Sequence, residues 1–350
     1  MKLAHIAGFA GISALLAGIV IACSPTAEPK ADGGETPGTT SGMKADYSGQ
    51  SLAIDGSGTV YPIGAAAAEM FKEKNPDVKI TVGKAGTGGG MKMFIKGETG
   101  ISDASRPIKD DEIKSLEEAK IEFIEVPIAL DGLCVIVNPK NTWLKSITIE
   151  QLNKIWNKDS KVKMWNEVDP TWPAEEIKLY GPTDAHGTYE YFNEVVNGKK
   201  DNVRPDYSQN AEYDPLVQGV ANEPHALGYV GFAYYMQNKE KIRAVPIDGG
   251  KGAVEPTKET IVDGTYSPFG RPLFMYVNKA KMTESSLLKD FMSFMLSPDG
   301  SAAVEAGDYL PLPADAIEMI KARFEAGTTG SIFNKAEAGQ SVTAVLTANK

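Results

Sequence analysis

Residues 86–106 hold the most informative grouping of chemically useful side chains in the sequence. The segment reads GTGGGMKMFIKGETGISDASR and joins a glycine-rich turn, a short amphipathic helix and a small-residue stretch that ends in Asp103 and Arg106. Glycine-rich turns at helix N-termini present backbone N–H groups that attract anions. An ionised Asp103 opposes an anion unless that anion carries a proton for the carboxylate to accept. The combination therefore indicates a protonated oxyanion.

Two side chains of this segment also have plainer interpretations. Arg106 offers a bidentate, charge-assisted contact to an oxyanion, or it pairs at the surface with Asp110 or Asp111. Asp103 accepts a proton from a ligand, or it caps the helix that is expected to begin near Ile108. The residues alone leave both pairs of alternatives open.

A second glycine-containing turn follows an expected strand at residues 51–54. It reads DGSGTVYP over residues 55–62 and leads into a helical pattern that begins near Val60. Its Ser57 or Thr59 hydroxyl either caps that helix or donates to an anion at the helix N-terminus. The turn alone does not distinguish an ordinary capped connection from a binding site.

A third turn of this kind lies in residues 180–192, which read YGPTDAHGTYEYF. A strand runs into the turn and a helix follows it, so another helix N-terminus is available to an anion. The Gly187 N–H and the Thr188 N–H and hydroxyl are its natural donors.

The elements that position these turns alternate between short apolar strands and amphipathic helices. This alternation predicts an α/β fold with mostly parallel sheets covered on both faces. The expected strands are 51–54, 78–82 and 177–180, and the expected helices are 60–74, 91–96 and 108–119.

Two segments interrupt the alternation and are predicted to cross between domains. Residues 123–137 (FIEVPIALDGLCVIV) are long and strand-like, and residues 267–277 (SPFGRPLFMYV) place a Pro/Gly cluster before a strand. We expect the chain to leave the first domain near Ile128 and return near Phe269, with a ligand cleft between the domains. Domain 1 is then 48–128 plus 270–350, and domain 2 is 129–269.

The N-terminal residues are predicted to address the protein to a membrane. Residues 1–22 resemble a bacterial lipoprotein signal peptide, with lipid attached to Cys23 after cleavage. A transmembrane anchor is the alternative, which the short apolar run and its terminal Cys disfavour. Residues 23–47 are rich in Pro, Gly, Ser and Thr and read as a flexible tether.

Composition excludes several classes of function. The formal net charge of −10 argues against a nucleic-acid partner. His186 and His225 are far apart in sequence and have no neighbours at metal-ligand spacing, so we expect neither a metal nor another cofactor. Cys134 lies in an apolar run and reads as a small buried hydrophobe. No nucleophile–base arrangement suggests an enzyme.

Five segments in order resemble the periplasmic phosphate-binding proteins of the phosphate-specific ABC transporter, the PstS-like family, and within it the SphX-like branch. The resemblance implies a type II periplasmic-binding-protein fold, in which two α/β domains joined by a two-segment hinge close on one phosphate. The segments are DGSGTVYP, GTGGGMKMFIKGETGISDASRPI, IALDGLCVIVNP, LVQGVANEPHALGYVGFAYY and RPLFMYVN.

The resemblance also assigns ligand contacts, and the sequence departs from the family pattern at two of its positions. The family Ser before Gly-Thr is His186 here, and the Arg that some members place four residues earlier falls on Pro182. A neutral His186 offers one N–H donor in place of the hydroxyl, and a protonated one adds charge. The phosphate-binding residues so implied are Thr59, Val60, Thr87, Asp103, Arg106, His186, Gly187 and Thr188.

The implied partners are inorganic phosphate, the permease subunits of an ABC transporter, and a membrane reached through lipid on Cys23. We expect a monomer in the cell envelope that faces the periplasm or the exterior. The alternative is an oxyanion sensor or scavenger that acts without a transporter.

Overall fold

The computed structural model describes most of the chain from Asp46 onward. The predicted signal peptide at 1–22, the lipidation site Cys23 and the tether at 23–47, apart from its last two residues, lie outside the described residues. The described residues are 46–350 without Ala185, Lys200, Ala338 and Lys350.

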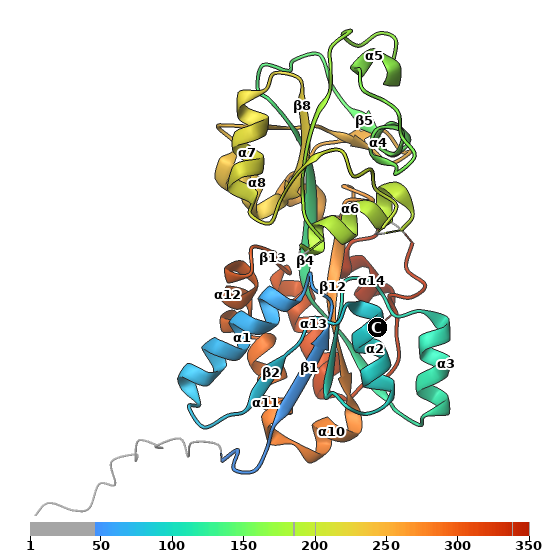
Figure 1. Ribbon diagram of the computed structural model, residues 1–350. Helices are drawn as coiled ribbons and strands as arrows, with labels where there is room; N and C mark the ends of the chain where they lie inside the picture. Colours follow the sequence, from blue (N-terminus) through green and yellow to red (C-terminus); the bar gives the residue numbers. More distant parts are fainter. Residues whose placement is uncertain (1–45, 185, 200, 338, 350) are drawn as a thin grey trace, which may run out of the picture. The chain divides into compact units, whose positions relative to one another are not determined.

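One long strand, β4 (Phe123–Val137), is the central element of the fold (Figure 1). From Phe123 to Gly132 it pairs antiparallel with β12 (Gly270–Asn278), and from Leu133 it pairs antiparallel with β8 (Ala226–Gly231). All of its residues are buried, which explains why the sequence reads as a continuous apolar run rather than as an alternating one. The predicted boundaries of this segment agree with the structure.

The first lobe surrounds the N-terminal half of β4. Its sheet has the order β2-β1-β3-β12-β4, in which β1 pairs parallel with β2 and β3 and β12 pairs antiparallel with β3. Its strands are β1 (Leu52–Gly56), β2 (Ile80–Val82), β3 (Ile101–Ala104) and β13 (Leu310–Pro311). Its helices are α1 (Tyr61–Lys74), α2 (Thr87–Ile95), α3 (Asp110–Glu118), α10 (Lys279–Glu284), α11 (Ser286–Met295), α12 (Pro298–Ala306), α13 (Ala314–Glu325) and α14 (Val342–Ala348).

The second lobe surrounds the C-terminal half of β4. Its sheet continues in the order β4-β8-β6-β7, with β6 pairing parallel with β7 and β8. The other strands are β5 (Ile147–Thr148), β6 (Lys178–Pro182), β7 (Ser208–Asn210), β9 (Arg243–Ala244), β10 (Ile247–Asp248) and β11 (Ala253–Val254). The helices are α4 (Ile149–Trp156), α5 (Trp165–Val168), α6 (Gly187–Asn197), α7 (Tyr213–Asn222), α8 (Phe232–Asn238) and α9 (Lys258–Val262).

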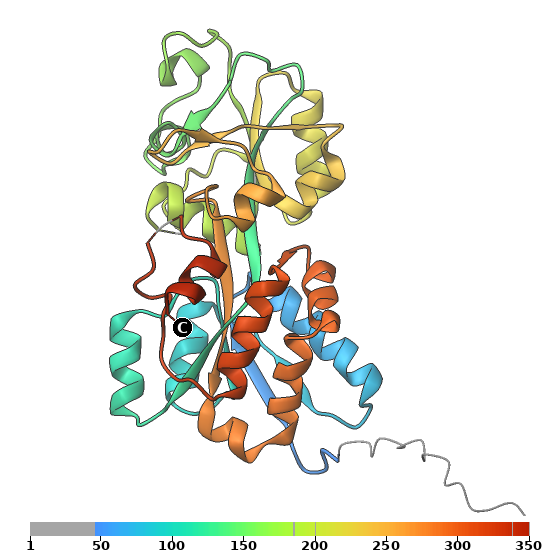
Figure 2. The same ribbon diagram turned by 180° about the vertical axis from the view of Figure 1, so that it is seen from behind.

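The pairing is parallel in the outer strands of each lobe and antiparallel at the two strands that link them. The chain leaves the first lobe along β4 and returns along β12, so these two strands must run in opposite directions. Figures 1 and 2 show them side by side between the lobes. The mostly parallel sheets expected from the alternation are therefore mixed sheets around an antiparallel centre.

The place where β4 changes partner supports the predicted division of the chain. Gly132 is its last residue opposite β12, and the Leu133 N–H donates to the Phe269 carbonyl at 3.0 Å before the pairing with β8 begins. We propose that domain 1 comprises residues 48–128 and 270–350 and that domain 2 comprises residues 129–269, with the hinge in these two strands.

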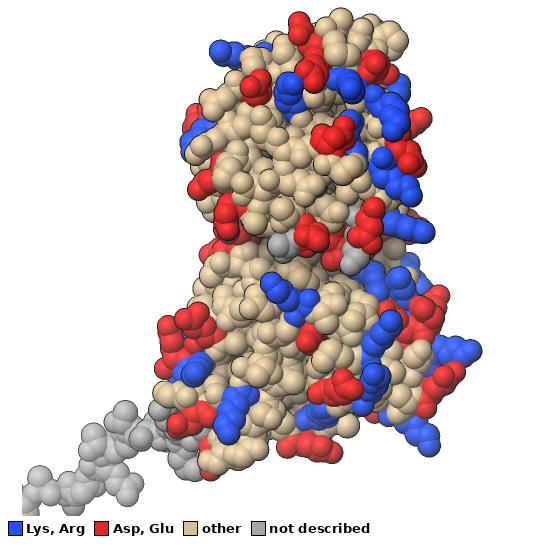
Figure 3. Space-filling view, in the orientation of Figure 1, with Lys and Arg blue, Asp and Glu red and all other residues tan. Residues whose placement is uncertain are grey.

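Aromatic packing fills the second lobe. Trp143 contacts Trp165 edge to face, with ring centroids 4.8 Å apart, and Trp156 packs on Phe192, which stacks on Tyr229 at 3.8 Å. Trp156 and Trp165 are core residues, and the half-buried Trp143 packs against that core. On the face drawn in Figure 3, acidic and basic side chains are interspersed. Among the described residues, no helix is both long and apolar enough to span a bilayer.

Candidate functional site

Helix α2 begins at Thr87, four residues before the predicted start at Met91. The glycines belong to its first turn because α2 passes very close to β1. A Cβ added at Gly90 would lie 2.4 Å from the Cα of Gly56, and Gly86 has a φ of 83°, which favours glycine. The sequence therefore brings a helix N-terminus against the carboxyl end of a central strand.

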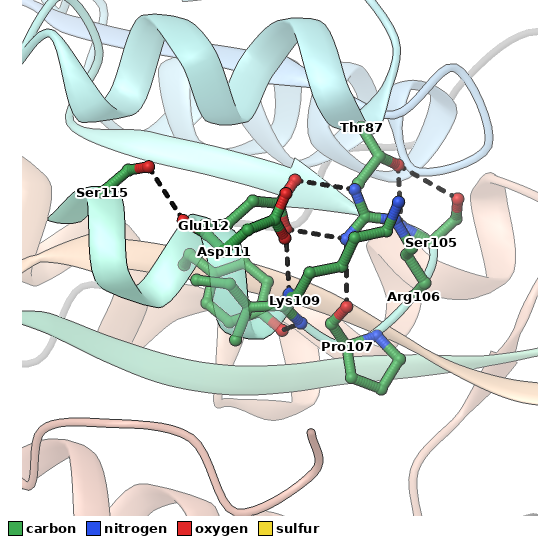
Figure 4. Close-up of polar contacts among 10 residues, drawn as sticks. Thr87, Ser105, Arg106, Pro107, Lys109, Asp111, Glu112 and Ser115 are labelled. Atoms are coloured by element: carbon green, nitrogen blue, oxygen red, sulfur yellow. Dashed lines mark hydrogen bonds and ion pairs between the residues drawn. The ribbon is translucent and has the colours of Figure 1, made fainter. Parts of the chain in front are cut away.

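The Thr87 side chain reaches the end of β3. Its hydroxyl lies 3.2 Å from the Ser105 hydroxyl and accepts the Ser105 N–H at 3.3 Å (Figure 4). Thr87 was predicted from the sequence to contact ligand, whereas Ser105 was not singled out. Both side chains are buried.

Ser57 organises the turn before α1. Its hydroxyl accepts the Thr59 N–H at 3.1 Å, its carbonyl accepts the Val60 N–H at 3.1 Å, and its own N–H donates to the Asp103 carbonyl at 2.9 Å. Ser57 thus holds the turn, and Thr59 does not cap the helix. The Thr59 hydroxyl is left to point at the opposite lobe.

The two lobes meet where Thr59 packs on Gly187, the first residue of α6. A Cβ added at Gly187 would lie 2.2 Å from Thr59 Oγ1 and 2.6 Å from Thr59 Cα. Such a close approach tolerates no side chain at this position. The contact joins two turns that lie far apart in sequence and that were both predicted as anion sites.

Three helix N-termini therefore converge on this region without side-chain caps. Among the described residues, Val60, Gly86 and His186, which precede α1, α2 and α6, make no side-chain cap hydrogen bond. The positive ends of the three helix dipoles favour a bound anion. The first turns of α2 and α6 also offer N–H groups, whereas in α1 the Tyr61 and Ile63 N–H groups bond to backbone carbonyls and Pro62 has none.

Asp103 lies beneath the first turn of α1. Its carboxyl is completely buried, and neither oxygen has a hydrogen-bond partner among the described residues. Oδ2 would be 3.4 Å from a Cβ at Gly64. Burial, and secondarily the charge of Asp55, raises the pKa of Asp103 well above its usual value. A buried carboxyl of this kind calls for a partner that shares a proton.

The alternative role of Asp103 as a helix cap is wrong. Helix α3 begins at Asp110, and the Lys109 N–H before it donates to the Glu112 carboxylate at 2.9 Å. Glu112 therefore provides the contact at this helix N-terminus that sequence reasoning gave to Asp103.

Arg106 is held by the same glutamate. Its two terminal nitrogens donate to the two Glu112 oxygens at 2.8 and 2.9 Å, and one of them also donates to the Pro107 carbonyl at 3.1 Å (Figure 4). The alternative interpretation from the sequence was a surface ion pair of Arg106 with Asp110 or Asp111, but the observed partner is Glu112. Glu112 lies one helical turn past Lys109, so it reaches back over the helix start.

The residues expected from the second lobe adjoin a cavity of about 280 Å³. His186, Gly187 and Thr188 line it together with Tyr213 and Asp131. The Thr188 hydroxyl is 2.6 Å from the Tyr213 hydroxyl, and the His186 ring packs on Tyr213 with Nε2 contacting the Ala211 carbonyl. That contact places the ring proton on Nε2, so Nδ1 is the acceptor of a neutral His186.

The model of the PBP superfamily domain matches residues 26–299. The chain belongs to the PBP superfamily. It is 41% identical over 286 residues to Protein SphX of Synechocystis sp., covering 81% of this chain and 85% of that protein. It is 42% identical over 261 residues to the phosphate-binding protein PstS of Staphylococcus saprophyticus, covering 74% and 79%. The predicted resemblance is thus confirmed.

Two solved structures have a fold similar to that of this chain. A possible phosphate binding protein from Planctomyces limnophilus is 44% identical, with a TM-score of 0.76 over 80% of this chain and 99% of that one. A Clostridium perfringens protein provisionally assigned as a phosphate ABC transporter substrate-binding protein, solved with bound phosphate, is 28% identical with a TM-score of 0.54 over 75% and 100%. The predicted type II fold is therefore confirmed.

In this PBP superfamily member, sequence reasoning missed Arg271. Its segment, RPLFMYVN, was interpreted as the returning strand and as part of the family resemblance, and no role was assigned to the arginine. The structure places the guanidinium 3.4 Å from Thr59 Oγ1 and 3.4 Å from the ring centroid of Tyr191 on α6. The signal that was available is an arginine directly before an apolar strand, in a segment predicted to border the cleft.

Proposed function

We propose that this protein captures inorganic phosphate in the cleft between its two domains and delivers it to the permease of an ABC transporter. The observation that supports this most directly is the Asp103 carboxyl, which is buried beside the first turn of α1 with no hydrogen-bond partner in the part of the chain that the structure describes. The protein's SphX and PstS relatives and the phosphate-bound structural neighbour agree with this proposal.

Binding rests on backbone and hydroxyl donors rather than on a metal. The uncapped first turns of α2 and α6 supply N–H groups, α1 contributes the positive end of its dipole, and Thr59, Thr87 and Thr188 supply hydroxyls. Because a helix N-terminus favours negative charge, these donors suit an anion even on a protein whose net charge is −10. The ligand-binding residues that we propose are Thr59, Val60, Thr87, Asp103, Arg106, Gly187 and Thr188, with His186 at the edge.

Asp103 selects phosphate over sulfate. Near neutral pH, phosphate keeps at least one P–OH group, whereas sulfate has none. One proton shared between Asp103 and a phosphate oxygen satisfies both buried groups. Sulfate brings no proton, so an ionised Asp103 faces a bare oxygen, and a like-charge contact of this kind costs several kcal/mol.

The protein acts as a carrier and not as a catalyst. The described residues contain no group of three or more His, Cys, Asp or Glu side chains arranged to hold a metal ion. Burial raises the pKa of the Cys134 thiol well above its usual value, so the thiol is a poor nucleophile. Phosphate leaves unchanged, and nucleic acid is not a partner.

We also propose where the carrier works. Residues 1–22 direct export, lipid on Cys23 anchors the chain to a membrane, and residues 23–47 tether a monomeric body that faces the periplasm or the exterior. The lipoprotein pattern of residues 1–23 supports this part of the proposal.

Calorimetric titration with phosphate, arsenate and sulfate tests the function. We expect about one phosphate per chain, tight binding of arsenate, which also keeps a protonated oxygen, and much weaker binding of sulfate. The proposal is wrong if protein that has been freed of bound anion gives no heat of binding and no rise in melting temperature with excess phosphate.

A further inference from the structure

Arg271 contacts both sides of the cleft from the strand that links the domains. Its Nε donates to Asp131 Oδ2 on β4 at 3.2 Å, and one terminal nitrogen lies 3.4 Å from the Thr59 hydroxyl of the first lobe. The guanidinium lies over the ring of Tyr191, on α6 of the second lobe, 3.4 Å from its centroid. The Arg271 guanidinium thus contacts one residue of each lobe, Thr59 and Tyr191, as well as its counterion Asp131.

We propose that Arg271 is a ligand-binding residue and supplies the positive charge of the anion site. Its unoccupied N–H groups donate to the oxygens of the anion held beside Thr59. This inference rests on the proposed phosphate-binding function and adds to it a residue that the family resemblance did not indicate.

The donor inventory of Arg271 leaves room for a ligand. A guanidinium has five N–H donors. Hydrogen bonds to Asp131 and Thr59 use two of them, and the other three have no hydrogen-bond partner within the described residues. The Arg271 side chain is only 13% exposed, so water is a poor substitute for these bonds.

The surroundings fix the guanidinium before any ligand arrives. Asp131, whose side chain is 7% exposed, sets its direction, and the Tyr191 ring sets its plane. The Tyr191 hydroxyl in turn donates to the Pro268 carbonyl at 2.6 Å, which holds the ring. A donor that is already oriented loses little freedom on binding, so its contact with the anion is efficient.

Arg106 is less available for the same task. Its two terminal nitrogens are both bonded to the Glu112 carboxylate, so its fork is engaged within the first lobe. Arg271 has a single bond to its carboxylate, and one of its terminal nitrogens lies beside Thr59. The geometry therefore favours Arg271 as the principal cation.

A neutral replacement of the ion pair tests the proposal without leaving a buried charge. The variants are Arg271→Gln with Asp131→Asn, Asp131→Asn alone, and Arg271→Lys, measured from Ser24 onward so that the compact unit 46–350 is complete. Arg243→Gln is the matched control, because Arg243 is also half-buried but donates to the Asn141 and Leu144 carbonyls of the second lobe.

Phosphate affinity is measured by calorimetry, and folding by the melting temperature of the phosphate-free protein. We expect the double variant to lose about thirtyfold or more in affinity. Arg271→Lys should lose affinity in part, because a point charge cannot reproduce the fork. Arg243→Gln should bind within about threefold of the parent. Asp131→Asn alone should lose clearly less affinity than the double variant, because it keeps the Arg271 cation and removes only the group that orients it.

Two results overturn the inference. One is a folded double variant that binds phosphate like the parent. The other is an Asp131→Asn variant that loses as much affinity as the double variant, since the effect then belongs to the ion pair. A crystal structure with phosphate must also place a guanidinium nitrogen within about 3.2 Å of a phosphate oxygen. If the parent protein binds no phosphate, both the proposed function and this inference are wrong. If the parent binds phosphate and the double variant binds it equally well, only the inference about Arg271 is wrong.

Discussion

The Tyr276 hydroxyl donates to the buried Glu125 carboxylate at 3.1 Å and accepts the Ile108 N–H at 2.7 Å. Glu125 also accepts hydrogen bonds from Ser331 and from the Ile332 and Phe333 N–H groups. One hydroxyl on β12 therefore connects the segment that follows Arg106 to the carboxylate that holds the C-terminal loop.

Tyr276→Phe should lower the free energy of unfolding by about 1–3 kcal/mol, because the Ile108 N–H loses its acceptor and Glu125 loses one donor. Denaturant unfolding measures the change. Tyr180→Phe is the matched control, since its hydroxyl makes no hydrogen bond with the described residues. Equal stability of the two variants would mean that the Tyr276 hydroxyl is not structurally required.

Asp103→Asn should stabilise the phosphate-free protein at neutral pH. The pKa of Asp103 is raised on folding, chiefly by burial, so the folded state holds the proton more tightly than the unfolded state. Its contribution to stability is therefore complete below the unfolded pKa of about 3.9 and is lost as pH rises through the folded pKa. An asparagine side chain does not ionise, so its contribution to stability does not fall as pH rises.

Melting temperatures from about pH 4 to pH 8 measure this effect. The advantage of Asp103→Asn over the parent should grow with pH, and comparison between the two removes the similar contributions of Glu125 and Asp131, whose pKa values burial also raises. Parallel curves would show that Asp103 keeps an ordinary pKa.

The same substitution should narrow the ratio of phosphate to sulfate affinity, because an amide can donate to a sulfate oxygen where a carboxylate cannot. Competition titrations with both anions measure the ratio. An unchanged ratio would mean that another residue determines the selectivity for phosphate, and His186 would be the next residue to test.

Gly187→Ala should prevent the cleft from closing fully. The new Cβ would lie 2.2 Å from Thr59 Oγ1, and the Thr59 backbone cannot move away easily. We expect phosphate affinity to fall more than about tenfold, with little change in the melting temperature of the ligand-free protein. Gly58→Ala is the control, because a Cβ there meets nothing within 4 Å. Full affinity in Gly187→Ala would show that phosphate binds without this contact.

Arg106→Ala should weaken phosphate and sulfate by similar factors, because a cation attracts both anions. Glu112→Gln should have the opposite sign, since it releases the Arg106 fork and removes a negative charge beside it. Titrations of the two variants with both anions measure these effects. A selective loss of phosphate alone in Arg106→Ala would contradict the assignment.

Cys23→Ser should release the exported protein from membranes, since lipid on Cys23 is its proposed anchor. Ultracentrifugation of cell extracts separates the two forms. Continued sedimentation with membranes, with the signal peptide removed, would show that another part of the chain is the anchor.

The sequence predicted those features that depend on local pattern. The limits of β4, the helix at 61–74 and the turns beside Thr59 and Gly187 follow from apolar runs, prolines and glycines. The start of α2 was missed because three glycines read as a turn, whereas Gly90 is required by the approach of Gly56.

Other features depend on contacts between distant segments, which a single sequence does not show. The engagement of Arg106 by Glu112 depends on where α3 begins. The position of Arg271 beside Thr59 depends on the return path of β12, and those residues are separated by 212 positions. Composition and motif spacing do not show which residues that are distant in sequence come into contact.

The shared strand β4 has a consequence for how the molecule comes apart. Neither lobe has a complete sheet of its own, because β4 and β12 both contribute to the core where the lobes join. Melting of one lobe withdraws the central strand from the other, so heat should produce one cooperative calorimetric transition rather than two. Fragments cut at the domain boundary should accordingly stay unfolded until they are mixed.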